Sequence, residues 1–148
     1  LIDVTADDLN TTDCLQLLMH YCVEPQLPDY CFVYDYPEPQ AALAVVEEND
    51  QGIPVARRFE LYGGGMELAN GYQELTDPME QRRRFKRDQA ERNRRGLPVV
   101  AADERLLAAL ESGLSPCAGV ALGVDRLLML ACGARDISEV IAFPDARA

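Results

Sequence analysis

Three glutamates, Glu60, Glu67 and Glu74, recur at intervals of seven residues on either side of a glycine run. A separation of seven in an extended chain places two side chains on opposite faces, so one regular strand cannot gather them. A hairpin that turns at Gly63–Gly65 can set Glu60 beside Glu67. Two carboxylates at close range repel unless a divalent cation lies between them, and Mg²⁺ prefers carboxylate oxygens together with substrate phosphates. The spacing therefore predicts a magnesium site at Glu60 and Glu67.

The third glutamate ends a segment, ELANGYQE, with different chemistry. On a strand, Asn70, Tyr72 and Glu74 share one face. An amide, an aromatic ring and a carboxylate together suit an amino acid with a cationic side chain. The same residues are also compatible with an ordinary exposed polar strand.

A glycine-flanked arginine occurs further on, in GVALGVDRLLML. Gly119 and Gly123 allow a planar ligand or a phosphate to approach the backbone closely. Arg126, early in the helix that should follow, could donate a fork of hydrogen bonds to a phosphate. Asp125 is most simply interpreted as the cap of that helix. The glycines match the dinucleotide-binding pattern GxGxxG poorly, so that fold is not supported.

The elements that must position these residues are predicted by apolar patterns and turn residues. In the first half we expect a helix over 14–22, capped by Thr11 or Thr12 and ended by Pro25 and Pro28. Strands are expected at 30–36 and 42–48, followed by the hairpin at 58–75.

In the second half, Thr76 or Asp77 should cap a long charged helix that ends near Arg95. A helix at 103–111, a strand at 119–124, a helix at 125–133 and a short strand at 139–144 complete the pattern. The order of elements predicts one α+β unit on a mostly antiparallel sheet.

The net charge of −11 argues against a nucleic-acid-binding surface over the whole chain. Eight of the 14 basic residues nevertheless lie in one stretch, from Arg82 to Arg95. This stretch is either a solvated helix face or a contact for an acidic macromolecule or ATP phosphates.

The cysteine spacing and the hydropathy pattern indicate the cellular compartment of the protein. The five cysteines include no CxxC pair and the single histidine, His20, lies in an apolar helical stretch, so neither a disulfide framework nor a zinc site is favoured. No apolar run is long enough to span a membrane, and no secretory leader is visible at a start that lacks Met. We expect a reduced, cytoplasmic protein.

Three motifs resemble the class II aminoacyl-tRNA synthetases of the lysyl type. GVALGVDR resembles motif 3 of that class, RFELYGGGMELANGYQELTD resembles the lysyl-type signature, and YDYPEP with the following ALA lies where that family has a strand ending in a Pro-Glu element. The resemblance covers nearly all of residues 30–148, in order and spacing.

The resemblance implies a role for each matching residue. Glu60 and Glu67 match carboxylates that are associated with Mg²⁺ and ATP. Leu68 and Gly123 match residues that form the wall against the adenine and ribose, and Arg126 matches the arginine that binds the γ-phosphate. Asn70, Tyr72 and Glu74 match substrate-binding residues of the family, and Glu74 matches the carboxylate that recognises the lysine ε-ammonium.

The implied reaction is in-line attack of the substrate carboxylate on the ATP α-phosphate, which gives an aminoacyl adenylate and pyrophosphate. A carboxylate is ionised at neutral pH, so no general base is needed, and Arg126 and Glu67, with Mg²⁺, would act by positioning and charge stabilisation. Motifs 1 and 2 should lie upstream and are not found in residues 1–148. We therefore interpret the chain as the C-terminal part of a catalytic domain and expect it to be inactive alone.

Details of the motifs resemble the branch of this family that attaches β-lysine to elongation factor P, a group of synthetase paralogues without an anticodon-binding domain. These details are ELANGY with ELTD, the Arg-rich helix, the ending FPDARA, and Ala121 where lysyl-tRNA synthetases usually carry glycine. The extra methyl of Ala121 would narrow the pocket near the substrate's amino group and help select a β-amino acid.

The partners implied by this resemblance are β-lysine, ATP and elongation factor P as protein acceptor. The full-length protein is expected to be a homodimer, with tRNA and membranes not expected as partners. A catalytic fragment of a lysyl-tRNA synthetase and a non-catalytic regulator on the same fold remain as alternatives.

Overall fold

A two-residue turn at Gly64 and Gly65 organises the sheet in the computed structural model, which describes residues 9–144. Both glycines have positive φ, +56° and +73°, as the common two-residue hairpin turn requires. The turn joins β3 (Pro54–Gly63) to β4 (Met66–Gln73) in antiparallel pairing. The predicted hairpin is therefore confirmed.

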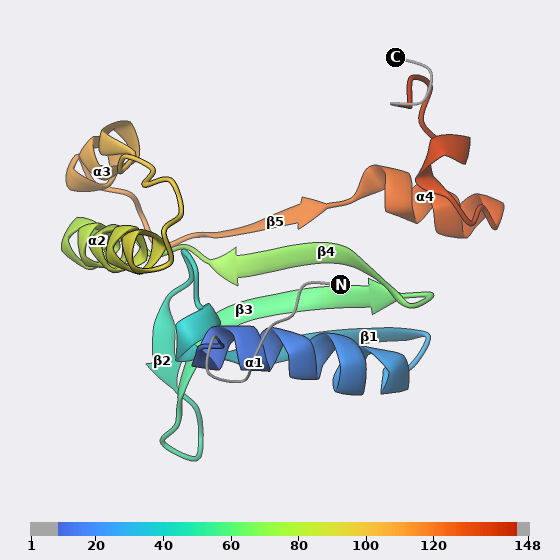
Figure 1. The fold of residues 1–148 in the computed structure, drawn as a ribbon, viewed down its shortest axis with the longest axis horizontal. Helices are drawn as coiled ribbons and strands as arrows, with labels where there is room; N and C mark the ends of the chain where they lie inside the picture. Colours follow the sequence, from blue (N-terminus) through green and yellow to red (C-terminus); the bar gives the residue numbers. More distant parts are fainter. Residues whose placement is uncertain (1–8, 145–148) are drawn as a thin grey trace.

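The hairpin forms the centre of an antiparallel sheet (Figure 1). β1 (Tyr30–Pro37) pairs with β3 on one side, and β5 (Ala118–Leu122) pairs with β4 on the other. The short β2 (Val46–Glu48) also pairs with β3, on the side of β4 and beyond the end of β4's pairing at Arg58. With its flanking helices this arrangement confirms the predicted α+β class.

The helices occupy three positions around the sheet (Figure 1). α2 (Pro78–Arg94) and α3 (Glu104–Glu111) lie together at one end, while α4 (Val124–Cys132) follows β5 at the other. α1 (Thr11–Leu18) continues directly into a π-helical turn, Met19–Val23. Side chains from this segment and from β1 and β3 line the same cavity, so α1 lies over the face of the sheet that carries Glu60. Among residues 9–144, no helix has the length and apolar character needed to cross a membrane.

The helix starts follow from capping side chains. Asp77, one of the two predicted caps, accepts hydrogen bonds from the backbone N–H groups of Met79 and Glu80. The predicted caps of the first helix, Thr11 and Thr12, are wrong, because Asn10 accepts from the Asp13 N–H and Asp13 accepts from the Asn10 N–H in return. This reciprocal pair satisfies two backbone donors at once.

Two predicted strands differ from the structure. The run 42–48 is extended over only its last three residues, and Ala44 instead forms an isolated bridge with Glu74. The strand expected at 139–144 is wrong: Ile137–Glu139 form a 3-10 turn. A reciprocal cap between Asp136 and Glu139 stabilises this turn, and no strand of the described chain pairs with the segment. The last residues of the FPDARA ending lie outside the described range.

A small buried core joins the strands to the following turn. It contains Tyr36, Ala41, Ala44 and Ala56. The buried Arg84 of α2 donates to the backbone carbonyls of Ala42 and Ala44 at 2.9 and 2.8 Å, which fixes α2 against this corner of the sheet.

A polar clamp holds the start of α1 against the end of α2. Arg95 donates to the Asp13 carboxylate at 2.7 Å and to Glu91 at 2.6 Å, and Asn10 donates to Glu91 at 3.2 Å. The hydrogen bond from Arg95 lowers the pKa of Asp13, and those from Arg94 and Arg95 lower the pKa of Glu91. Both acids are therefore favoured in their charged forms in the folded state.

We expect this clamp to fail in acid. A carboxyl whose pKa is lowered on folding stabilises the fold above its unfolded pKa, here 3.8 and 4.5, and loses that contribution as the pH falls further. Amide hydrogen exchange in α1 should therefore speed up below about pH 4.5 relative to the strands. Arg95→Gln should show the faster exchange already at pH 7. Arg94→Gln is the matched control, because Arg94 contacts Glu91 on its own helix and does not bridge to α1. Equal exchange in α1 in both variants would contradict the clamp.

Candidate active site

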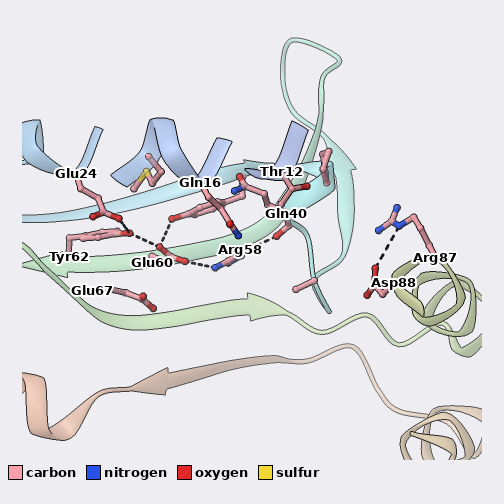
Figure 2. A pocket seen from close by; sticks show the side chains of 14 residues that line it. Thr12, Gln16, Glu24, Gln40, Arg58, Glu60, Tyr62, Glu67, Arg87 and Asp88 are labelled. Atoms are coloured by element: carbon pink, nitrogen blue, oxygen red, sulfur yellow. Dashed lines mark hydrogen bonds and ion pairs between the residues drawn. The ribbon is translucent and has the colours of Figure 1, made fainter. Parts of the chain in front are cut away.

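Glu60 is the most enclosed carboxylate of the predicted site, with 7% of its surface exposed. One oxygen accepts hydrogen bonds from the phenols of Tyr36 and Tyr62 at 2.6 and 2.8 Å. The other pairs with the Arg58 guanidinium (Figure 2) and accepts from the Asn70 amide at 3.3 Å. Four donors thus surround one carboxylate, which is what a buried charge requires.

An irregularity in β1 brings Tyr36 to Glu60. Tyr34 pairs with Phe59 and Tyr36 with Ala56, so the register shifts at Asp35, whose φ is +59°. In a regular strand Tyr36 would share the face of Tyr34. The bulge turns Tyr36 to the opposite face, where its phenol meets the carboxylate.

A second irregularity, in β4, brings Glu67 to the same region. Leu61 pairs with Ala69 and Tyr62 with Glu67, so the pairing skips Leu68. Glu60 faces Asn70 across the ladder rather than Glu67. Glu60 and Glu67 nevertheless line one cavity of about 450 Å³, together with Tyr62. The hairpin therefore brings the two glutamates to one cavity, as predicted, although they are not direct partners in the ladder.

The predicted substrate residues continue along β4 from this network. Asn70 lies opposite Ala121 of β5, and Tyr72 lies opposite Gly119, so all four positions share the face of Glu60. Glu74 lies just after the strand. A Cβ placed on Gly119 would lie 2.9 Å from the nearer Glu74 carboxylate oxygen, so this glycine leaves the space that the carboxylate occupies.

Burial and nearby charge raise the pKa of three tyrosines on this face. Burial raises the pKa of Tyr36 and Tyr62, and the hydrogen bond that each phenol donates to Glu60 raises it further. Burial is also the larger cause for Tyr72, followed by the nearby negative charge of Glu74. All three phenols are therefore protonated at neutral pH, and those of Tyr36 and Tyr62 donate to Glu60.

Arg126 lies at the other end of the face, where α4 begins. Its guanidinium donates to the backbone carbonyl of Glu67 at 2.7 Å and lies 3.9 Å from the Glu67 carboxylate. Gly123 donates its N–H to the carbonyl of Leu68 at 2.8 Å, which ties α4 to the bulged part of β4. The interpretation of Asp125 as helix cap is wrong. Gly123 occupies the cap position without a side-chain bond, and Asp125 lies in the first turn.

The two carboxylates predicted to hold Mg²⁺ differ in how available they are. Glu60 already accepts hydrogen bonds from four protein donors. The Glu67 side chain is 37% exposed and has Arg126 as its ion-pair neighbour. Residues 9–144 contain no cluster of three or more potential metal ligands. The donor set fits a Mg²⁺ ion that takes one or two carboxylates and completes its shell with phosphates and water, with Glu67 the better placed of the two.

Sequence reasoning missed Tyr36, Arg58 and Tyr62 as members of this site. Arg58 and Tyr62 alternate with Glu60 along β3, which places all three on one face. That alternation was readable in the sequence. The turn of Tyr36 toward Glu60 was not, because it depends on the bulge at Asp35.

The Arg-rich helix α2 is largely paired with acids of its own chain. Arg82 binds Glu104 through two hydrogen bonds of 3.0 Å, and Arg83 and Arg84 both bind Glu80. These last two pairs lower the pKa of Glu80 to about 2. This pairing favours a solvated, ion-paired helix over a contact for an acidic partner.

In the described part of the chain, the cysteines and His20 donate no hydrogen bond to Glu60, although Cys31 lies opposite Tyr62 in the strand ladder. The five cysteines, all at described positions, form no disulfide. His20 pairs with Glu24 at 3.0 Å on the exposed side of the π-helical turn. Glu24 is in turn 3.5 Å from the Tyr62 hydroxyl, so the α1 segment contacts the edge of the Glu60 network.

Residues 5–147 match the family model of the class II tRNA synthetases specific for D, K and N. The chain belongs to this family. The antiparallel sheet with flanking helices is therefore part of a class II synthetase domain.

Within the family, the chain is similar to several proteins that share one name, elongation factor P–(R)-β-lysine ligase. Those of Proteus mirabilis (strain HI4320) and Pseudoalteromonas translucida (strain TAC 125) are 52% and 50% identical over 150 and 148 residues, which cover 100% and 99% of this chain. The protein of Klebsiella pneumoniae (strain 342) is 52% identical over 97% of the chain. The chain spans less than half the length of these relatives, 46%, 45% and 44%.

The geometry of this class II domain predicts that Glu60 contributes more to stability than an exposed glutamate does. Glu60→Gln leaves Arg58 without its buried counter-charge and places an amide against the two phenols. We expect a loss of about 3 kcal/mol in the free energy of unfolding, measured by urea denaturation. Glu47→Gln, which breaks the exposed pair with Arg57, is the control and should cost less than about 0.5 kcal/mol. Similar costs for the two variants would show that the Glu60 network is not buried as described.

Proposed function

We propose that the protein to which this chain belongs activates (R)-β-lysine with ATP as an adenylate and transfers it to a lysine of elongation factor P. The chain would supply the C-terminal part of the catalytic domain, with motif 3, while motifs 1 and 2 lie elsewhere in the protein. The name shared by the similar proteins supports the substrate and the acceptor. The observation that carries the chemistry is the single face that holds Asn70, Tyr72 and Ala121, with Glu74 at one end and Arg126 at the other.

The substrate would lie along this face with its side-chain ammonium at Glu74. Glu74 forms no ion pair with a residue in 9–144, so its charge is available to a cation from outside the chain. Tyr72 provides an aromatic wall beside it, and Asn70 offers an amide one pair further along β4. The carboxylate of the amino acid would then point toward the Glu67–Arg126 end, where ATP would bind against Leu68 and Gly123.

In the first step, an oxygen of the amino-acid carboxylate forms a bond to the α-phosphorus of ATP and the bond from that phosphorus to the bridging oxygen breaks. Pyrophosphate leaves with the bonding electron pair. In the second step, the amine of the acceptor lysine attacks the adenylate carbonyl carbon, AMP leaves, and the amine loses a proton. Arg126 would hold negative charge on the phosphates. A Mg²⁺ ion held by Glu67, with Glu60 close by, would supply further phosphate charge neutralisation.

The remaining parts of the proposal concern the assembly and the compartment. We place the full-length protein in the cytoplasm as a homodimer that does not use tRNA. The unpaired cysteines are compatible with a reducing compartment, and the acidic net charge of −11 does not favour tRNA binding by this part of the protein.

Amino-acid-dependent ATP–pyrophosphate exchange by the full-length natural protein tests this function. Exchange should be strongest with β-lysine, weaker with α-lysine and absent without an amino acid. Preference for α-lysine would instead indicate a lysyl-tRNA synthetase. No exchange with either amino acid would contradict catalysis by this domain.

The same assay tests the role of Glu74. Glu74→Gln removes the charge that would pair with the substrate ammonium, a loss of about 2 kcal/mol or roughly thirtyfold in kcat/KM for β-lysine. The KM for ATP should change little. Glu48→Gln, on the exposed edge of β2, is the control for a general charge effect. A Glu74 variant that matches this control would place the ammonium elsewhere.

Ala121 should contribute to the choice between β- and α-amino acids. Its methyl shares the substrate face and lies opposite Asn70. Ala121→Gly should improve the use of α-lysine relative to β-lysine by about tenfold, because one methyl group supplies only about 1–3 kcal/mol of discrimination. Ala118→Gly, on the other face of β5, is the control. An unchanged ratio of α- to β-lysine exchange in Ala121→Gly would refute this role.

A further inference from the structure

Arg58 is a largely buried cation on the face proposed to bind a cationic substrate. Its side chain is 18% exposed. The guanidinium points in three directions: to the Glu60 carboxylate, to the Asn70 amide oxygen at 3.4 Å and to the backbone carbonyl of Gln40 at 3.0 Å. It also lies 4.6 Å from the centre of the Tyr36 ring. A planar guanidinium can satisfy these directions together, which a lysine ammonium cannot.

These contacts fix the orientation of the Asn70 side chain. The Asn70 amide oxygen accepts from Arg58, and its NH₂ group donates to Glu60. An amide rotated by 180° would direct its NH₂ at the guanidinium and its oxygen at the carboxylate, both unfavourable. Arg58 and Glu60 therefore determine how the Asn70 amide oxygen and NH₂ group are oriented toward the substrate face.

The same pair also balances charge on the face. An unpaired arginine here would repel an ammonium group, because Arg58 lies directly opposite Tyr72 in the strand ladder. Glu60 neutralises it at direct contact. Glu74, two residues beyond Tyr72, then remains the carboxylate on this face without an ion-pair partner in residues 9–144.

We propose that Arg58 is a positioning residue of the amino-acid site, which holds the Asn70 amide in one orientation and leaves Glu74 as the carboxylate available to the substrate ammonium. This inference rests on the proposed function, since it concerns how that site selects its amino acid. A purely structural role would be different. Arg58 would then only tie β3 to Gln40 and Tyr36, and its loss would affect stability and both substrates alike.

The test uses Arg58→Lys in the full-length natural protein, with exchange measured against β-lysine and against ATP. Lysine keeps the charge that balances Glu60 but cannot also hold the Asn70 amide. The KM for β-lysine should rise about tenfold, while the KM for ATP stays within about twofold. Arg58→Gln, which also leaves Glu60 uncompensated, should raise the β-lysine KM further.

Arg57→Lys is the matched control, because Arg57 is the adjacent residue, points to the other face and pairs with the exposed Glu47. It should leave both KM values unchanged. In an Asn70→Ala background, Arg58→Lys should add less than about twofold, because the amide it positions is gone.

The outcomes separate this inference from the proposed function. Additive effects of Arg58→Lys and Asn70→Ala would show that Arg58 has only a structural role. Equal increases in the KM values for β-lysine and for ATP would show the same. An Arg58→Lys variant that behaves like Arg57→Lys would also overturn the inference while the function stands. Absence of exchange in the unsubstituted protein would remove the function itself.

Discussion

A carboxylate removed from water is unfavourable unless donors replace the lost hydration, and Glu60 shows how this requirement organises the site. Its donors come from separate parts of the chain: Tyr36 from β1, Arg58 and Tyr62 from β3, and Asn70 from β4. Each strand must therefore adopt the register that delivers its donor. The network couples the sheet register to the positions of the groups proposed to meet the substrate.

The same requirement gives a physical reason for two departures from regular pairing. Without the bulge at Asp35, Tyr36 would face away from Glu60. Without the skipped Leu68, Glu67 would not lie opposite Tyr62. Asp35 adopts a positive φ of +59°, which is unfavourable for most residues other than glycine, asparagine and aspartate. Aspartate therefore tolerates this conformation at a small cost, and the buried hydrogen bond that Tyr36 donates to Glu60 helps to offset it. The irregular backbone at Asp35 and Leu68 thus orients the side chains of Tyr36 and Glu67, as bulges near active sites commonly do.

These two irregularities also separate what the sequence predicts from what it does not. The Gly64–Gly65 turn, the alternation along β3 and β4 and the cap at Asp77 depend on local residue types, and all were predictable. The placement of Tyr36 depends on a register shift that the pattern YCFVYDY does not signal. The strand prediction for residues 139–144 was wrong for a related reason. Its apolar residues are typical of a strand, but a strand needs a partner, and the reciprocal cap at Asp136 favours a turn. Residue patterns predicted which groups belong to the site, while long-range pairing decided how they face one another.

The three regularly spaced glutamates have different environments in the folded chain, and these differences are what allow three roles for one residue type. Glu60 is enclosed by four donors and stabilises the strands around it. Glu67 is partly exposed beside Arg126, whose positive charge favours the approach of an anionic phosphate. The Glu74 carboxylate lies next to Gly119 and has no ion-pair partner in the described chain, so its negative charge stays available to a cation. Most arginines of α2 pair with acids of their own chain, and Arg92 donates to the Pro98 carbonyl. Arg58 and Arg126 lie on the proposed substrate face, beside Glu60 and Glu67 respectively, and their positions distinguish these two glutamates from Glu74.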